Sequence, residues 1–98
     1  MSGVVLWRVL APEAMVTREW HGEAVLYNEA TGSTHHLNVL GRFVMATLLE
    51  HPSGIALTAL VHRIADDAED IADGELHAAV EHTLATLADL GLATSVPV

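Results

Sequence analysis

The stretch that decides the fold is WHGEAVLYNEATGSTHHLN, residues 20–38. It contains two turn signals, His21-Gly22 and Ala30 to Ser33, on either side of the β-rich run Glu23 to Asn28. Glycine in each turn supplies the positive φ that a tight hairpin requires. Together with Met15 to Trp20 before the first turn and Thr34 to Leu37 after the second, the stretch predicts a three-stranded antiparallel meander.

An extra strand is predicted ahead of the meander. The run Val4 to Val9 is rich in β-forming residues and ends at the break Ala11-Pro12-Glu13. The sequence does not say which strand this segment pairs with.

Three helices are predicted after the meander, because apolar residues recur there at steps of three and four. The first follows Asn38, a good N-cap, and ends at residues 51–54. The second spans about Ala56 to Asp66. Asp73 can cap the third, which runs to about Leu90, with Gly91 as its C-cap. The residues expected on the buried faces are Leu40, Phe43, Val44, Thr47 and Leu48, then Leu57, Leu60, Val61 and Ile64, then Leu76, Val80, Leu84, Leu87 and Leu90.

The order of these elements favours one fold class. Strands in one block and helices in the next indicate an α+β fold with an antiparallel sheet. We expect a winged helix-turn-helix-like architecture, in which a three-stranded sheet and the extra N-terminal strand precede three helices. The length predicts a single domain over residues 1–98, with strands over about 4–37 and helices over about 38–91.

Charge and composition narrow the function. The chain has four arginines, no lysine and 13 acidic residues, for a net charge of −9. That field repels phosphate backbones, so a winged-helix nucleic-acid-binding regulator is the alternative and not the leading hypothesis. The absence of cysteine excludes disulfides and thiolate chemistry. No signal peptide or membrane-length apolar run is present, so a cytoplasmic protein without a membrane partner is expected.

The sequence offers no catalytic or metal-binding motif. His35 and His36 are adjacent on a predicted strand, so their side chains point to opposite faces and cannot both ligate one metal. The acidic run that begins with the loop Asp66 to Asp70 lacks the EF-hand ligand spacing. No Gly-x-Ser-x-Gly elbow or phosphate-cradling loop occurs. We therefore expect no enzyme, metal or cofactor; a small metal-dependent or hydrolytic enzyme is the third hypothesis.

The last strand of the meander, Thr34 to Leu37, is a candidate binding edge. It carries no lysine or proline, the residues that usually blunt an exposed edge. Such an edge can accept an extended peptide as an added strand, with the third helix as the second wall of a groove. It can also pair with a second copy of the chain, or be covered by the N-terminal segment around Leu6 and Trp7. The residues leave these alternatives open.

Four segments carry a resemblance to a known family: WHGEAVLYN (20–28), TGSTHHLN (31–38), HPS (51–53) and LGL (90–92). In this order they resemble the PqqD-like family, and within it the peptide chaperones of the HPr-kinase-related "HPr-rel-A" system. The resemblance covers nearly the whole chain. It implies a RiPP recognition element of winged helix-turn-helix type, without catalysis or cofactor.

The resemblance also implies a ligand and a site. The family member binds the leader of a ribosomally made precursor peptide by β-strand addition and presents it to a modifying enzyme, which in this branch would be HPr-kinase-related. The leader would lie along the third strand of the meander, beside the third helix. The corresponding residues here are Ser33, Thr34, His35, His36 and Leu37 on the strand, and Leu76, Ala79, Val80, Thr83 and Leu87 on the helix.

Overall fold

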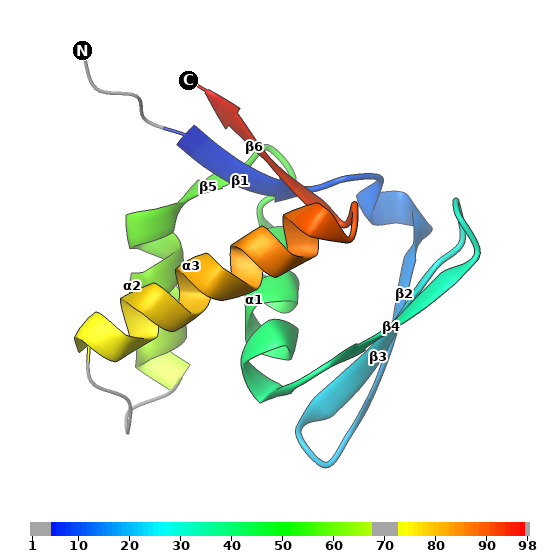
Figure 1. Cartoon of the computed structure of the whole chain (residues 1–98), viewed down its shortest axis with the longest axis horizontal. Helices are drawn as coiled ribbons and strands as arrows, with labels where there is room; N and C mark the ends of the chain where they lie inside the picture. The colour runs from blue at the N-terminus through cyan, green and yellow to red at the C-terminus, as the bar shows by residue number, and fades with distance from the viewer. Residues whose placement is uncertain (1–4, 68–72, 98) are drawn as a thin grey trace.

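The computed structural model describes residues 5–67 and 73–97. The fold is α+β, with antiparallel sheets and three helices, as predicted (Figure 1). The elements in chain order are β1 (Val5–Val9), a 3₁₀ turn η1 (Pro12–Ala14), β2 (Met15–Trp20), β3 (Glu23–Asn28), β4 (Ser33–Leu37), α1 (Val39–Glu50), β5 (Ile55–Ala56), α2 (Leu57–Asp67), α3 (Asp73–Asp89) and β6 (Ala93–Pro97). Of the predicted acidic loop Asp66 to Asp70, the first two residues belong instead to α2. The rest of that loop, and Val4 at the start of the predicted N-terminal strand, lie outside the described residues.

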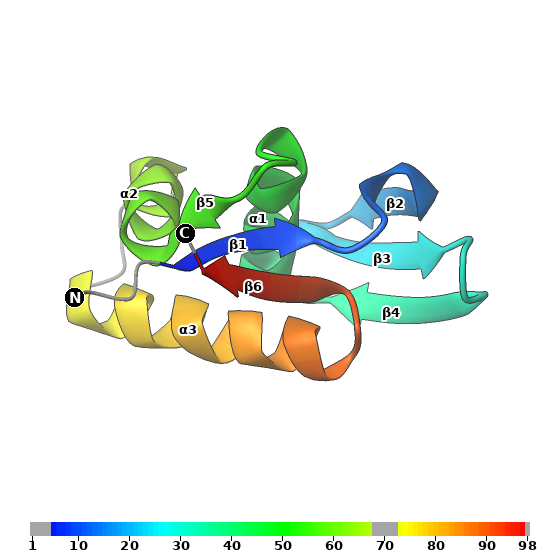
Figure 2. The same cartoon turned by 90° about the horizontal axis from the view of Figure 1, so that it is seen from above.

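The strands form two separate antiparallel sheets. The predicted meander is present, with strand order β2-β3-β4. The extra N-terminal strand does not join it: β1 lies between β5 and β6 in a second sheet of order β5-β1-β6 (Figure 2). The segment after α3, expected only to trail off extended, is the strand β6, which pairs with β1 over its whole length from Val5↔Pro97 to Val9↔Ala93. The prediction of strands in one block and helices in another is therefore corrected by β5 and β6.

The turns of the meander follow the sequence signals. His21 and Gly22 both have positive φ, at 55° and 81°, which is the geometry of a two-residue type I′ hairpin. Gly32 has a φ of 77° in the second turn, where its N–H donates to the Asn28 carbonyl at 2.8 Å. The side chain of Asn28, which is buried, accepts from the Ala30 N–H at 2.9 Å. Both hairpins are thus fixed by local backbone chemistry.

The core lies between the three helices and the inner faces of the two sheets. Four predicted residues of α3, namely Leu76, Val80, Leu84 and Leu87, are buried to 2% exposure or less. Leu90 does not continue this stripe, since 47% of it is exposed. The reason is the helix end: Gly91, with a φ of 76°, donates to the Ala88 carbonyl while Leu92 donates to the Leu87 carbonyl, a Schellman cap that turns the chain. Leu92 enters the core in place of Leu90.

Asn38 caps α1 as the sequence predicts. Its side-chain oxygen accepts from the Gly41 N–H at 2.8 Å, and its own backbone is extended. We expect Asn38→Ala to lower the free energy of unfolding by about 1 kcal/mol, because an orphan donor of the first turn loses its partner. Urea denaturation measures this loss. Asn38→Asp, which keeps the acceptor, is the control; an equal loss in both variants would contradict the role of the cap.

No helix in the described part of the chain is both long and apolar enough to cross a membrane.

Candidate functional site

The alternation of hydrogen-bonded and non-hydrogen-bonded residue pairs in the meander determines which backbone groups are free. In an antiparallel pair, opposed residues alternate between those that exchange backbone hydrogen bonds and those that do not. A two-residue type I′ hairpin closes on a bonded pair, here Trp20 opposite Glu23. The Glu29 N–H, just past the end of β3, donates to the Ala14 carbonyl at 2.8 Å. Glu29 is an even number of residues from Glu23, so this bond fits the same alternation. Glu23, Val25 and Tyr27 therefore direct their backbone groups toward β2.

The remaining residues of β3 bond to β4. The opposed pairs that exchange hydrogen bonds are Ala24↔Leu37, Leu26↔His35 and Asn28↔Ser33. It follows that the N–H and C=O groups of Thr34 and His36 point away from β3. No other strand pairs with β4 among residues 5–67 and 73–97, so these groups face an open edge.

A groove of about 250 Å³ lies between the end of β4, the start of α1 and the C-terminal half of α3. We call it the β4 groove; Figure 2 shows the end of β4 beside the last turns of α3. Its lining residues are His36, Leu37, Asn38, Gly41, His82, Thr83, Thr86, Leu87 and Leu90. Leu37 and Leu87 are nearly fully buried and form an apolar floor, while Leu90 stands exposed at the rim. The groove can therefore receive an apolar side chain from an extended chain on the β4 edge.

The capped start of α1 keeps one corner of the groove open. A Cβ on Gly41 would lie 3.2 Å from the Asn38 side-chain oxygen and 3.4 Å from the Leu37 Cβ. An added Cβ would therefore require the Asn38 side chain to shift by a few tenths of an ångström. Glycine at position 41 thus permits both the N-cap and the close approach of α1 to the end of β4.

The polar residues that line the groove keep hydrogen-bonding capacity that the protein itself does not use. The hydroxyls of Thr83 and Thr86 donate to carbonyls one turn earlier in α3, those of Ala79 and His82, at 2.9 and 3.1 Å. Each hydroxyl keeps acceptor capacity for a ligand. His36 Nε2 lies 2.9 Å from Glu23 Oε1 on the outer face of the sheet, where both side chains are exposed. That contact contributes little to stability and leaves the imidazole able to reorient.

The predicted alternation along β4 is confirmed. Leu37 is buried, and Ser33 and His35 lie half-buried on the same face, where His35 Nε2 is 3.0 Å from Ser33 Oγ. Thr34 and His36 are exposed on the other face. Within residues 5–67 and 73–97, no three His, Cys, Asp or Glu side chains gather closely enough to hold a metal ion.

Of the ten site residues predicted from the sequence, four line the β4 groove: His36, Leu37, Thr83 and Leu87. Thr34 lies on the open edge itself, and Ser33 and His35 lie further along β4. On α3, Leu76 and Val80 are fully buried in the core, and Ala79 is half-buried outside the groove. Sequence reasoning missed Asn38, Gly41, His82, Thr86 and Leu90. The signal that could have found three of them is helical spacing, since His82, Thr86 and Leu90 follow one another at four-residue steps beside the buried stripe.

The segment around Leu6 and Trp7 does not cover this edge. Trp7 is opposite Ile55 of β5 and Ser95 of β6, and its side chain lines a different cavity, of about 340 Å³, together with Leu57 and Leu84. The alternative in which Leu6 and Trp7 close the β4 edge is therefore wrong.

A family model described as coenzyme PQQ synthesis protein D (PqqD) matches residues 23–93. The chain belongs to the PqqD family. The matched residues run from the first residue of β3 to the first residue of β6, so both walls of the β4 groove lie within the part that defines this PqqD-family membership. No curated protein sequence matches the chain.

Two solved structures share the fold of this PqqD-family protein. One is "TbiB1 in Complex with the TbiA(beta) Leader Peptide", with a TM-score of 0.65 and 22% identity over 87% of this chain and 93% of that one. The other is "Lasso peptide synthetase B1 complexed with the leader peptide", with a TM-score of 0.66 and 12% identity over 90% of this chain and 96% of that one. At these identities the likeness shows a common fold.

Proposed function

We propose that this PqqD-family protein is a non-catalytic peptide chaperone, which binds the leader of a ribosomally made precursor peptide by strand addition to β4 and presents it to a modifying enzyme. The observation that carries the proposal is the open edge of β4, where the backbone groups of Thr34 and His36 are free and His36 borders the β4 groove. Two proteins of the same fold, TbiB1 and a lasso peptide synthetase B1, are each described in complex with a leader peptide, which supports this use of the fold.

The geometry supplies both parts of peptide recognition. Each of Thr34 and His36 offers one N–H and one C=O to an added strand, and these bonds are independent of the peptide's sequence. Alternate side chains of that strand point toward one face, so one of them enters the β4 groove against Leu37 and Leu87. Backbone bonds thus supply affinity, and the apolar floor with the Thr83 and Thr86 hydroxyls supplies selectivity.

The sequence also favours a particular enzyme partner and a cellular location. The four segments that resemble the HPr-rel-A branch favour an HPr-kinase-related modifying enzyme as the partner. A cytoplasmic location fits a chain without cysteine. A second copy of the chain would compete with the leader for the same β4 edge, so we propose that a homodimer through β4, if formed, excludes the peptide. The strands and helices would act as a single recognition domain over residues 1–98.

A nucleic-acid-binding regulator is not favoured. The net charge is −9, and α3, the helix that would enter a groove of DNA in a winged-helix protein, carries no arginine or lysine between residues 73 and 89. Affinity for a phosphate backbone depends on such cations.

Two substitutions at one position test strand addition. His36→Pro removes the N–H that faces the open edge, and proline is tolerated on an edge strand where that group makes no ladder bond. His36→Ala removes the same side chain but keeps the N–H. We expect His36→Pro to weaken binding of a candidate precursor peptide roughly fivefold relative to His36→Ala, since one hydrogen bond is worth about 1 kcal/mol. Isothermal titration calorimetry gives the two affinities, and circular dichroism verifies that both variants fold. Equal affinities in two folded variants would place the peptide elsewhere.

A further inference from the structure

The opposite edge of the meander is also open. In the same alternation, Val16, Arg18 and Trp20 exchange backbone hydrogen bonds with β3. The backbone groups of Thr17 and Glu19 therefore point outward from β2. The Met15 N–H is already used, since it donates to the Pro12 carbonyl. No strand in the described part of the chain pairs with this edge. Two consecutive outward positions, Thr17 and Glu19, are therefore available to an added strand.

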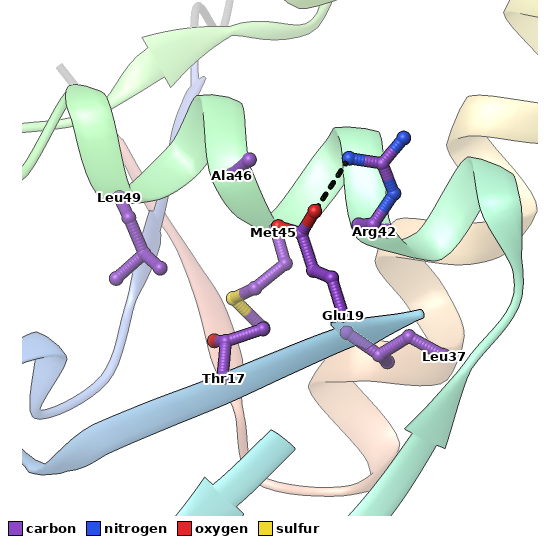
Figure 3. Close-up of a pocket in the computed structure, with 7 residues that line it drawn as sticks. All are labelled: Thr17, Glu19, Leu37, Arg42, Met45, Ala46 and Leu49. Atoms are coloured by element: carbon purple, nitrogen blue, oxygen red, sulfur yellow. Dashed lines mark hydrogen bonds and ion pairs between the residues drawn. The ribbon is translucent and has the colours of Figure 1, made fainter. Parts of the chain in front are cut away.

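A cleft lies directly beside this edge, which we call the β2 cleft. Helix α1 packs mainly on β3 and β4, so a space of about 250 Å³ remains between β2 and α1. Figure 3 shows Thr17 and Met45 reaching into it from the two walls. The lining residues are Thr17, Glu19, Leu37, Arg42, Met45, Ala46 and Leu49. Met45 and Leu37 are buried, so the floor is apolar. The outward backbone groups and the cleft come from the same two residues of β2.

The mouth of the β2 cleft presents a carboxylate and not a free cation. Arg42 makes three interactions within the protein. Its Nε donates to the Gly22 carbonyl at 2.8 Å, and its Nη1 donates to Glu19 Oε1 at 3.2 Å. Its guanidinium also lies 4.5 Å from the Phe43 ring centre. Its side chain is 21% exposed, against 53% for Glu19. Glu19 therefore keeps accessible acceptor positions, which a second cation can share with Arg42.

We infer that the β2 edge and the β2 cleft form a second strand-addition site, and that its occupant is an extended segment of a basic protein partner. Side chains two positions apart in an extended chain share one face. The occupant carries an apolar residue that enters the cleft and, two positions away, a lysine or arginine that meets Glu19. A second copy of this chain is disfavoured as the occupant, because two chains of net charge −9 repel each other. Because β3 separates the two edges, this partner and a chain bound at β4 can bind together.

Selection from a peptide library tests the inference. Random ten-residue peptides displayed on phage are selected on the immobilised full chain carrying Thr86→Arg, which fills the β4 groove. We expect enrichment of peptides with an apolar residue two positions from a lysine or arginine. Their affinity should fall at least tenfold when Ala46→Arg is added, because this side chain fills the β2 cleft and repels the cation. Ala59→Arg, an exposed residue of α2 outside the cleft, is the charge-matched control.

A third variant isolates the carboxylate. Glu19→Gln should weaken the enriched peptides several-fold, but should leave unchanged the same peptides with norleucine in place of the basic residue. The inference is overturned if no peptide is enriched on the Thr86→Arg chain, or if the enriched peptides bind the Ala46→Arg variant equally well. The inference does not depend on the proposed function. A second selection, on the chain carrying Ala46→Arg and an intact β4 groove, tests the β4 groove separately, so either site can fail alone.

Discussion

Replacing Thr86 by arginine should nearly abolish peptide binding while the protein stays folded. Thr86 is exposed on α3, and its hydroxyl donates to the His82 carbonyl of the same helix. Arginine has a higher helix propensity than threonine, so the helix does not lose stability. Its side chain, however, occupies the β4 groove where an apolar side chain of the ligand would sit. We expect affinity for the precursor peptide to fall roughly 100-fold, or about 2.7 kcal/mol, as for loss of an interface hot spot.

The matched control for Thr86→Arg is Ala88→Arg. Ala88 is exposed on the same helix and lies about 200° around its axis from Thr86, so the added charge is the same but the groove stays empty. Fluorescence anisotropy with the labelled precursor peptide compares the two. A similar loss in both variants would assign the effect to charge, and unchanged affinity in Thr86→Arg would remove the β4 groove from the binding site.

The largest loss of stability should come from Gly54→Ala. Gly54 lies between α1 and β5 with a φ of 114°, a conformation that residues with a side chain rarely adopt. An added Cβ would also lie 2.7 Å from the Leu6 Cβ. Leu6 cannot retreat easily, because its backbone is held in register with Ala56 of β5 and Val96 of β6. We expect the free energy of unfolding to fall by about 3 kcal/mol or more, from backbone strain and overpacking together.

Gly32→Ala separates these two causes. Gly32 also has a positive φ, 77°, but nothing lies within 4 Å of an added Cβ. This variant should lose only about 1 kcal/mol, the cost of the left-handed conformation. Thermal and urea denaturation of both variants give the comparison. If Gly54→Ala were no worse than Gly32→Ala, the contact with Leu6 would have no energetic weight.

The parts of the fold that were predictable are those with a local cause. The His21-Gly22 and Gly32 turns, the Asn38 cap and the Gly91 cap each depend on residues within one turn of chain, and all four are present. The strand β6 was missed because its partner is β1, at the other end of the sequence, and β5 because two residues carry no period. Leu90 was misplaced because periodicity does not register that a helix has ended.

The candidate site was predictable only on its strand side. Alternation along β4 placed Leu37 on the inner face and His36 on the outer face, since period two needs no knowledge of the rest of the fold. On α3, periodicity identifies only the buried face, to which Leu76 and Val80 belong. A groove is lined instead by the strip beside the buried face, near the point where helix and strand approach each other. That point lies at the C-terminal half of α3 and is set by tertiary packing, which no local pattern encodes.

The pairing of β1 with β6 has a consequence for how this protein can be combined with others. Val5 lies directly opposite Pro97, so the two ends of the described chain leave the molecule side by side (Figures 1 and 2). Neither β1 nor β6 contributes to the β4 groove or the β2 cleft. A short linker can therefore join the ends in a circular permutant, or the whole unit can be inserted into a surface loop of a host enzyme as a recognition cassette, without passing across either edge of the meander.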